Sequence, residues 1–341
     1  MQKSKEAKNV GINYRASNKG TKYSYSRVNV FDSCGWKYYL TYEAGHYIYQ
    51  DSLAADFGTL VHHIEESIGL SLKAGEKPNY DKLKDEFEHI NIPKKDKYDT
   101  EGGIYGIEIL KKKYPKEFFE ANQNGQSYFT KSLDYKSTGI YRLENRLSKA
   151  PNLKVWACEQ YFDVTFLNRR FGGFIDRIIF DEDTGDYYVE DIKTKDHPFK
   201  DEELVTPLQF VIYVQALSDM LNIDPKKIHC VYDLPICDWR QDAGTKGFLK
   251  RGLTKLEKIF NQIDNKEFVP NPTPLCWWCP FNHGNPDAPA EGKNLCPYYS
   301  LWRPDNRVRE VANLWEGMER HAIIVKRLDN NEVDSIIDFD F

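Results

Sequence analysis

The clearest alternation of apolar and polar residues lies in the middle of the chain and predicts a β-hairpin. One strand covers 171–180 and the returning strand covers 187–193. Between them, 181–186 reads Asp-Glu-Asp-Thr-Gly-Asp, a composition typical of a turn. If Phe180 pairs with Tyr187, the register of the whole hairpin follows, because the side-chain period of a strand is two.

This register brings charged side chains together on one face of the hairpin. Asp176 then lies directly opposite Asp191, with Cβ atoms about 5 Å apart. Lys193 shares the face because it follows Asp191 by two residues. A register two residues away would make the two aspartates diagonal neighbours on the same face, whereas an odd slip would separate them. Carboxylates placed in this way suit magnesium or manganese. The alternative is a surface hairpin with a cross-strand salt bridge, an interaction that contributes little stability.

Helical periodicity surrounds the hairpin and predicts an α/β fold with a central mixed sheet flanked by helices. An amphipathic pattern begins at Ser24. Residues 75–150 are expected to form a partly helical insertion, because their first part lacks clean periodicity. The segment 204–221 predicts one long helix with Pro207 in its first turns. The remaining helices are expected over 59–69, 141–148 and 248–263, and the remaining strands over 156–166 and 228–234.

The length and the composition are typical of a globular protein with one large domain or two smaller ones. The chain has 341 residues, of which 40% are hydrophobic and 29% charged. No apolar run approaches the roughly 20 residues that span a bilayer, and the start lacks the apolar core of a signal peptide. We therefore expect a cytoplasmic protein without a membrane partner. In a reducing cytoplasm, seven cysteines favour metal ligands or buried thiols over disulfides.

The net charge of −5 conceals a segregation of charge along the chain. Residues 1–22 are basic and poor in large apolar side chains, which predicts a disordered arm. A second basic run covers 240–258, and each run is either a track for phosphates or a solvated face. The acidic tail, 328–341, holds five acids and no base. It is either a docking segment for a partner or a solubilising tail.

Four short motifs follow one another along the chain. They are Gly58-Thr59-Leu60-Val61-His62, Gly173-Phe174-Ile175-Asp176, Asp191-Ile192-Lys193-Thr194 and Gln209-Phe210-Val211-Ile212-Tyr213. In this order they resemble the RecB-like exonuclease branch of the PD-(D/E)XK nuclease superfamily. The resemblance implies a restriction-endonuclease-like core in a single nuclease domain over 23–327, with DNA as the substrate.

The resemblance also implies a division of roles. His62, Asp176, Asp191 and the carbonyl group of Ile192 would bind Mg²⁺ or Mn²⁺. Lys193 would hold or deprotonate the attacking water and offset developing negative charge. Phosphodiester hydrolysis needs an activated water and relief of charge on phosphate, which divalent ions supply.

Further residues are candidates for the active site, but each also has a purely structural interpretation. Gln209 and Tyr213 are four residues apart and share a helix face, where they would bind phosphate or orient the lysine. On spacing alone, an ordinary half-buried helix is the better interpretation. Glu159 matches an acidic position of the family and also fits a salt-bridged strand residue. His63, next to His62, is interpreted as a helix-surface histidine.

The cysteines form a second pattern. Cys276 and Cys279 form a C-x-x-C motif, Cys296 follows after 16 residues, and Cys34 lies far upstream. The layout resembles that of the AddB subunit and the CRISPR adaptation nucleases, which implies a [4Fe-4S] cluster and a Cys-rich clasp over 270–300. Four thiolates suit zinc as well. The last gap is longer than in those relatives and contains His283 as an alternative ligand. The other cysteines are expected to be buried thiols: Cys158, Cys230 and Cys237.

Together these features predict a metal-dependent DNA exonuclease of recombination, repair or processing. The first alternative is a nuclease-fold DNA-binding or recombination-partner module without its own cleavage activity. The second is a protein-interaction module with a zinc clasp. Helicase motifs are missing from the sequence, so a helicase, a recombinase or a single-strand-binding protein would be a separate partner.

Overall fold

The computed structural model describes residues 21–48, 51–95, 103–271, 273–282, 285, 288–293 and 295–296. By its internal contacts the chain divides into two compact units. The larger unit comprises Met1–Tyr23 and Asp51–Gly252, and the smaller unit comprises Ser24–Gln50 and Leu253–Phe341. The basic arm up to residue 20, His283 and the acidic tail lie outside the described residues. Predictions for them stay predictions, as do the domain limits 23–327.

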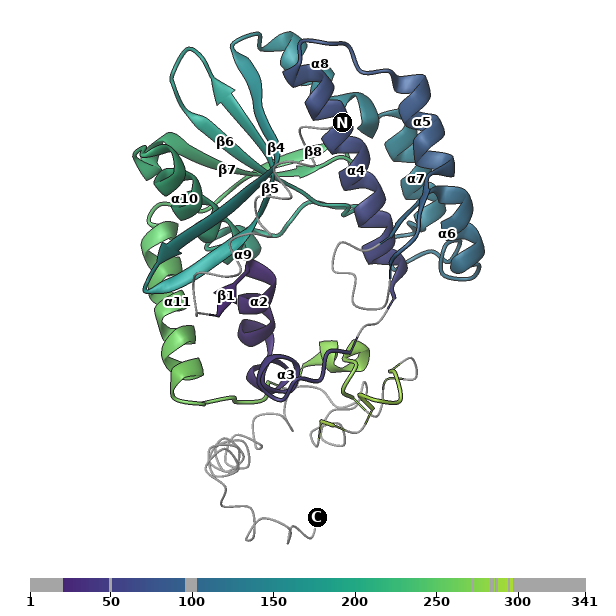
Figure 1. Ribbon diagram of the computed structural model, residues 1–341. Helices are drawn as coiled ribbons and strands as arrows, with labels where there is room; N and C mark the ends of the chain where they lie inside the picture. Colours follow the sequence, from purple (N-terminus) through teal and green to yellow (C-terminus); the bar gives the residue numbers. More distant parts are fainter. Residues whose placement is uncertain are drawn as a thin grey trace, which may run out of the picture. The chain divides into compact units, whose positions relative to one another are not determined.

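The larger unit is built on a six-stranded mixed sheet (Figure 1). Its strand order is β1-β5-β6-β7-β8, with β4 paired to β5. Strands β6 and β7 are parallel, whereas β4, β5 and β6 form an antiparallel meander. The predicted α/β class is therefore confirmed. The strands are β1 Lys22–Tyr23, β4 Leu153–Phe166, β5 Arg169–Asp181, β6 Tyr187–Ile192, β7 Ile228–Leu234 and β8 Trp239–Ala243.

Helices flank this sheet, with α10 on one side and α4 with α5 to α8 on the other in Figure 1. The helices of the larger unit are α4 Leu53–Lys73, α5 Tyr80–His89, α6 Ile107–Lys113, α7 Tyr128–Ser137, α8 Arg142–Lys149, α9 Asp201–Leu204 and α10 Leu208–Leu221. Short elements connect them: the strands β2 Asn91–Ile92 and β3 Ile104–Tyr105 and the 3-10 turns Gly139–Tyr141 and Pro225–Lys227. Among its described residues, the segment 75–150 contains the helices α5 to α8.

Helix α4 begins earlier than its predicted start at residue 59. Ser52 caps it by accepting a hydrogen bond from the backbone N–H of Ala55. From there its apolar face, including Phe57 and Ile64, is fully buried in the core of the larger unit. This burial fixes the helix that carries His62.

The prediction of one helix over 204–221 is wrong. Pro207 is the N-cap of α10, and α9 ends at Leu204. The residue before a proline is pushed toward extended backbone, which interrupts the helix at Thr206. By length and composition alone, Asp201–Leu221 qualifies as a membrane span, but 56% of its apolar window is buried inside the protein, as in a core helix.

The smaller unit gathers aromatic side chains around Phe268. The ring of Phe268 lies 6.0 Å from that of Tyr38 and 5.3 Å from that of Tyr39. A Cβ atom at Gly35 would lie 2.7 Å from the carbonyl oxygen of Val269, so only glycine permits this approach of two backbones. Its elements are α2 Tyr25–Ser33, α3 Gly35–Tyr38, the π turn Tyr39–Glu43, the 3-10 turn Pro274–Trp278 and α11 Phe248–Asp264, within which the unit boundary falls.

A buried ion network crosses the sheet of the larger unit. The guanidinium of Arg177 in β5, 1% exposed, donates to Glu190 of β6 at 2.6 Å, to Glu65 of α4 at 3.0 Å and to Asp233 of β7. The outer members of the network are Arg146 and Arg240 on Glu190, Arg142 on Asp233 and Tyr135 on Glu65.

The arginines of this network shift the pKa values of its carboxyl groups to different extents. Burial alone would raise the pKa of Glu190, but the positive charges of Arg146, Arg177 and Arg240 outweigh it and hold the pKa well below its usual range. Burial raises the pKa of Glu65, which Arg177 offsets only in part. Removing the central cation would therefore leave buried charges unpaired.

We expect Arg177→Met to lower the free energy of unfolding by about 3–5 kcal/mol, because three buried carboxylates lose a shared partner. Lys154→Met is the control, since Lys154 makes an exposed 3.9 Å ion pair with Glu182. This substitution should change stability by less than about 1 kcal/mol. Urea unfolding measures both. Equal effects of the two substitutions would contradict the assignment of Arg177 as the central cation.

Candidate active site

The β5–β6 hairpin adopts the register in which Asp176 lies across from Asp191. Phe180 pairs with Tyr187, and the ladder runs to Arg177 opposite Glu190. One step further the side chain of Asp176 reaches across, and its Oδ2 accepts a hydrogen bond from the backbone N–H of Ile192 at 2.7 Å. Asp176 is thus held at the point where the ladder ends.

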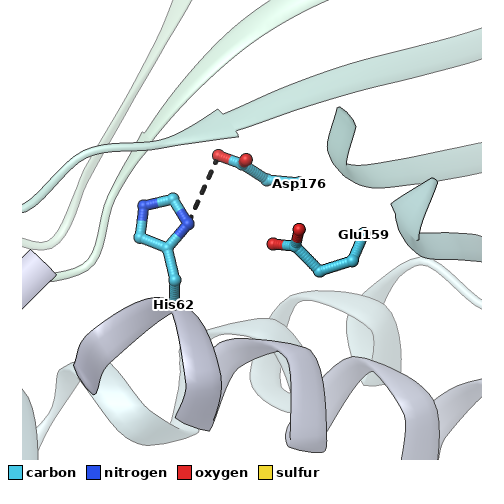
Figure 2. Close-up of side chains that lie close together, drawn as sticks. All are labelled: His62, Glu159 and Asp176. Atoms are coloured by element: carbon cyan, nitrogen blue, oxygen red, sulfur yellow. Dashed lines mark ion pairs between the residues drawn. The ribbon is translucent and has the colours of Figure 1, made fainter. Parts of the chain in front are cut away.

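Three side chains from three elements converge beside this point. His62 of α4, Glu159 of β4 and Asp176 of β5 each offer a ligand atom, and these atoms all lie within 4.8 Å of one another. Figure 2 shows the imidazole and the two carboxylates directed toward a common space. His62 Nδ1 lies 3.7 Å from Asp176 Oδ2. The group unites the predicted His62 and Asp176 with Glu159.

The second nitrogen of His62 is already engaged. Nε2 lies 2.9 Å from the carbonyl oxygen of Ile192, so the tautomer protonated at Nε2 donates to that oxygen. The lone pair of Nδ1 then remains available to a cation, an arrangement common for metal-binding histidines. Ile192, proposed as a ligand through its carbonyl group, here orients the imidazole. His63, next to His62 in the sequence, is half-buried, and its Nε2 makes no hydrogen bond with the residues that the structure describes.

Glu159 owes its position to an irregular stretch of β4. The register of β4 against β5 shifts between Val155 and Ala157. Glu159 itself has φ 45°, a left-handed backbone that a residue with a side chain adopts at a cost of about 1–3 kcal/mol. The pairs on either side, Cys158 with Arg177 and Gln160 with Ile175, place Glu159 across from Asp176. Such local strain is typical of functional positions.

Asp191 and Lys193 form a pair next to this group. Lys193 Nζ lies 2.7 Å from Asp191 Oδ2, and the aspartate is fully buried while the lysine side chain is 35% exposed. Burial raises the pKa of Asp191 to about 6; Lys193 opposes the rise and the negative charge of Asp176 adds to it. The ammonium group of Lys193 is thus partly exposed to solvent while it is held by the buried carboxylate of Asp191.

Helix α10 contributes Gln209 and Tyr213. Gln209 Nε2 donates to the Tyr213 hydroxyl at 2.8 Å, and both side chains are buried. Burial raises the pKa of Tyr213 well above its usual range, and the charges of Asp191, Asp176 and Glu159 raise it further. Tyr213 therefore lies in the field of all three carboxylates and stays protonated.

The donor set fits a hard divalent cation. One imidazole nitrogen and carboxylate oxygens are ligands that suit magnesium or manganese. Both oxygens of Asp191 are buried and accept no well-aligned hydrogen bond from the residues that the structure describes, despite the close lysine. A divalent cation would satisfy such oxygens and would reverse the rise in the pKa of Asp191.

The predicted cysteines meet within the smaller unit. Cys34, Cys276, Cys279 and Cys296 line a cavity of about 100 Å³. Cys34 Sγ accepts hydrogen bonds from the backbone N–H of Lys37 at 3.5 Å and of Asn271 at 3.4 Å. Burial raises the pKa of Cys276 and of Cys279, and the sulfur of Cys34 adds to both.

The remaining cysteines behave as packed thiols. Cys158 lies against α4, where a Cβ atom at Gly69 would come within 2.3 Å of its sulfur. Burial raises the pKa of Cys158 to about 12 and that of Cys230 further. Neither residue is poised to react or to bind a metal.

The second basic run, 240–258, serves the fold at several positions. Arg240 pairs with Glu190, and Arg251 donates to the carbonyl oxygen of Val205 at 3.0 Å. Lys255 pairs with Asp32 within the smaller unit at 2.7 Å. These contacts favour the interpretation as a solvated or structural face over a phosphate track.

An α/β core that gathers histidine and carboxylate side chains at the end of a hairpin suits metal-assisted cleavage of phosphodiesters. The chain belongs to the PD-(D/E)XK nuclease superfamily, whose family model matches residues 22–283. It is therefore a nuclease by family. No curated protein matches the chain significantly.

Among solved structures, the chain is similar to a protein from Eubacterium rectale described as a "putative exonuclease". The two are 14% identical with a TM-score of 0.41, over 76% of this chain and 86% of the other.

Several residues around the site escaped the sequence analysis. Arg177, Glu65 and Glu190 were not among the residues singled out from the sequence. The sequence did hold a signal for them: Arg177 follows Asp176, and Glu190 precedes Asp191, within otherwise apolar strands. A charged side chain on the opposite face of such a strand implies a buried partner of opposite charge.

We expect His62→Ala to weaken Mn²⁺ binding at least about tenfold, because it removes one of the three converging ligands. His63→Ala is the matched control on the same helix and should change the affinity less than twofold. Isothermal titration calorimetry on the metal-free protein measures both. Equal affinities of the His62 variant and the unmodified protein would exclude the histidine as a ligand.

Proposed function

We propose that the protein is a metal-dependent DNA exonuclease of the RecB-like branch, acting in the cytoplasm in recombination, repair or processing. The observation that carries the proposal is the convergence of His62, Glu159 and Asp176 beside the Asp191–Lys193 pair. A bound Mg²⁺ or Mn²⁺ would polarise the phosphate and lower the pKa of a coordinated water. His62, Glu159, Asp176 and Asp191 would hold it.

Lys193 has the charge and exposure to act on the substrate. Its Nζ is anchored by a buried carboxylate, so the side chain loses little further freedom when it binds an anionic oxygen. There it would hold the attacking water or stabilise the negative charge that develops on phosphate. Because the charges of Asp176 and His62 act on Asp191, the carboxylate that anchors the lysine lies close to the proposed metal ligands.

Tyr213 and Gln209 act as positioning residues in this proposal. The raised pKa keeps the phenol protonated at neutral pH, so Tyr213 donates a hydrogen bond and does not serve as a base. Gln209 fixes the hydroxyl by donating to it at 2.8 Å. The pair would orient a carboxylate or a phosphate oxygen near the site.

We further propose that the four cysteines of the smaller unit bind a [4Fe-4S] cluster. A single zinc ion held by four sulfurs at about 2.3 Å fills the space between them, whereas these four line a cavity of about 100 Å³. Backbone N–H groups directed at Cys34 Sγ also suit a cluster, whose sulfurs accept such hydrogen bonds. The cluster would join α2 to the segment after Asn271.

We expect Lys193→Ala to lower the rate of cleavage of labelled DNA with Mn²⁺ by about 10²–10⁴-fold, because it removes the ammonium from the reacting phosphate. Lys195→Ala is the matched control, since Lys195 lies over the ring of Phe199 and pairs with Glu203. It should retain at least half the activity.

Asp191→Asn should abolish cleavage as well. Cleavage that survives both the Lys193 and the Asp191 substitution would contradict the proposed mechanism. Binding of DNA without any cleavage by the unmodified protein would instead favour a DNA-binding or recombination-partner module.

Anaerobic purification should yield a brown protein with four iron atoms per chain and the broad visible absorption of an iron-sulfur cluster. We expect Cys34→Ser to lose the iron and the colour, whereas Cys237→Ser, which lies outside the group, should keep both. A colourless protein with one zinc per chain would contradict the cluster and favour zinc.

A further inference from the structure

An exposed aromatic side chain lies beside the proposed catalytic carboxylates. Phe174 is 40% exposed in the middle of β5. It precedes Asp176 by two residues, so both side chains lie on the same side of the strand, about 7 Å apart along it. A partner that covers this ring would therefore also lie beside the site.

Phe174 has an aromatic neighbour on the adjacent strand β4. Tyr161 of β4 is its cross-strand partner, and the two ring centroids are 5.3 Å apart. Tyr161 follows Glu159 by two residues, as Phe174 precedes Asp176. The aromatic pair therefore lies two residues along the paired strands β4 and β5 from Glu159 and Asp176.

Hydrogen bonds fix the Tyr161 ring of this pair. The Tyr161 hydroxyl donates to Asp163 at 3.0 Å and accepts a hydrogen bond from Lys22 Nζ at 2.7 Å. Asp163 in turn receives two hydrogen bonds from the guanidinium of Arg170, at 2.8 and 2.7 Å. A surface fixed in this way loses little freedom when a flat ligand stacks on it.

A positive charge accompanies the pair. Lys22 Nζ lies 4.8 Å from the centre of the Tyr161 ring, and its side chain is 39% exposed. A flat exposed ring with a cation next to it is the combination by which proteins bind single-stranded nucleic acid, with a base on the ring and a phosphate on the cation.

We propose that Tyr161 and Phe174 form a stacking subsite for the base next to the scissile phosphate, which makes single-stranded nucleic acid the preferred substrate. Lys22 contacts the following phosphate. The location of the scissile phosphate rests on the proposed function. Within a duplex both faces of each base are already stacked, so a duplex reaches this subsite only after its end has frayed.

The test is binding of a fluorescently labelled single-stranded oligonucleotide in EDTA, measured by anisotropy, where no cleavage occurs. We expect Phe174→Ala to weaken single-strand binding about 5- to 150-fold, the contribution of one stacked base. Binding of a blunt duplex of the same length should change less than twofold. Phe119→Ala, an aromatic side chain that is 53% exposed in the insertion, is the matched control and should leave both affinities unchanged.

Two further variants separate stacking from folding. Phe174→Tyr retains a ring and should bind the single strand as the unmodified protein does, whereas Phe174→Leu retains apolar bulk and should lose most of the affinity. Equal single-strand affinities of the Tyr and Leu variants would overturn the subsite, even if the Ala variant unfolds. So would an unchanged affinity of a folded Phe174→Ala protein.

The outcome is distinguishable from failure of the proposed function. If the unmodified protein cleaves no DNA with Mn²⁺ but Phe174→Ala weakens single-strand binding, the nuclease proposal fails and the subsite stands. If the unmodified protein cleaves and Phe174→Ala binds and cleaves single strands equally well, only the subsite fails.

Discussion

One buried guanidinium constrains the geometry of the proposed site. Arg177 joins α4, β6 and β7 through Glu65, Glu190 and Asp233. Neighbouring residues on a strand point to opposite faces, so fixing Arg177 and Glu190 on one face fixes Asp176 and Asp191 on the other. Because a buried charge without its partner costs several kcal/mol, the strands cannot slide without breaking this network. The carboxylates are thus positioned by charges that never meet the substrate.

The two strands of the hairpin were predictable from their alternation, which also places Asp176 and Asp191 on one face in any even register. The particular pairing of Phe180 with Tyr187 was assumed from the position of the turn, and the structure confirms it. Glu159 was less accessible to sequence analysis, since its approach to Asp176 depends on a register shift and a left-handed backbone that no side-chain pattern encodes. The hydrogen bond between His62 and Ile192 likewise depends on how a helix packs against a strand end.

Other misses share a different physical origin. Strand β8, with the sequence Trp-Arg-Gln-Asp-Ala, shows no alternation of apolar and polar residues. It forms a strand because it pairs with β7, which its own sequence does not reveal. The proline that divides α9 from α10 was read as tolerated, although Thr206 before it cannot stay helical. The ion network escaped notice because charged residues on strands usually face water, and only tertiary packing shows that these do not.

The backbone of Glu159 has a consequence for attempts to improve the protein. Its φ of 45° is nearly free of strain for glycine and unfavourable for glutamate. A redesign guided only by thermal stability would therefore replace this residue early and remove a carboxylate from the site, an instance of the trade-off between stability and activity. Position 159 should be held constant in any such library, and a sequence that tolerates glutamate there retains it for its chemistry.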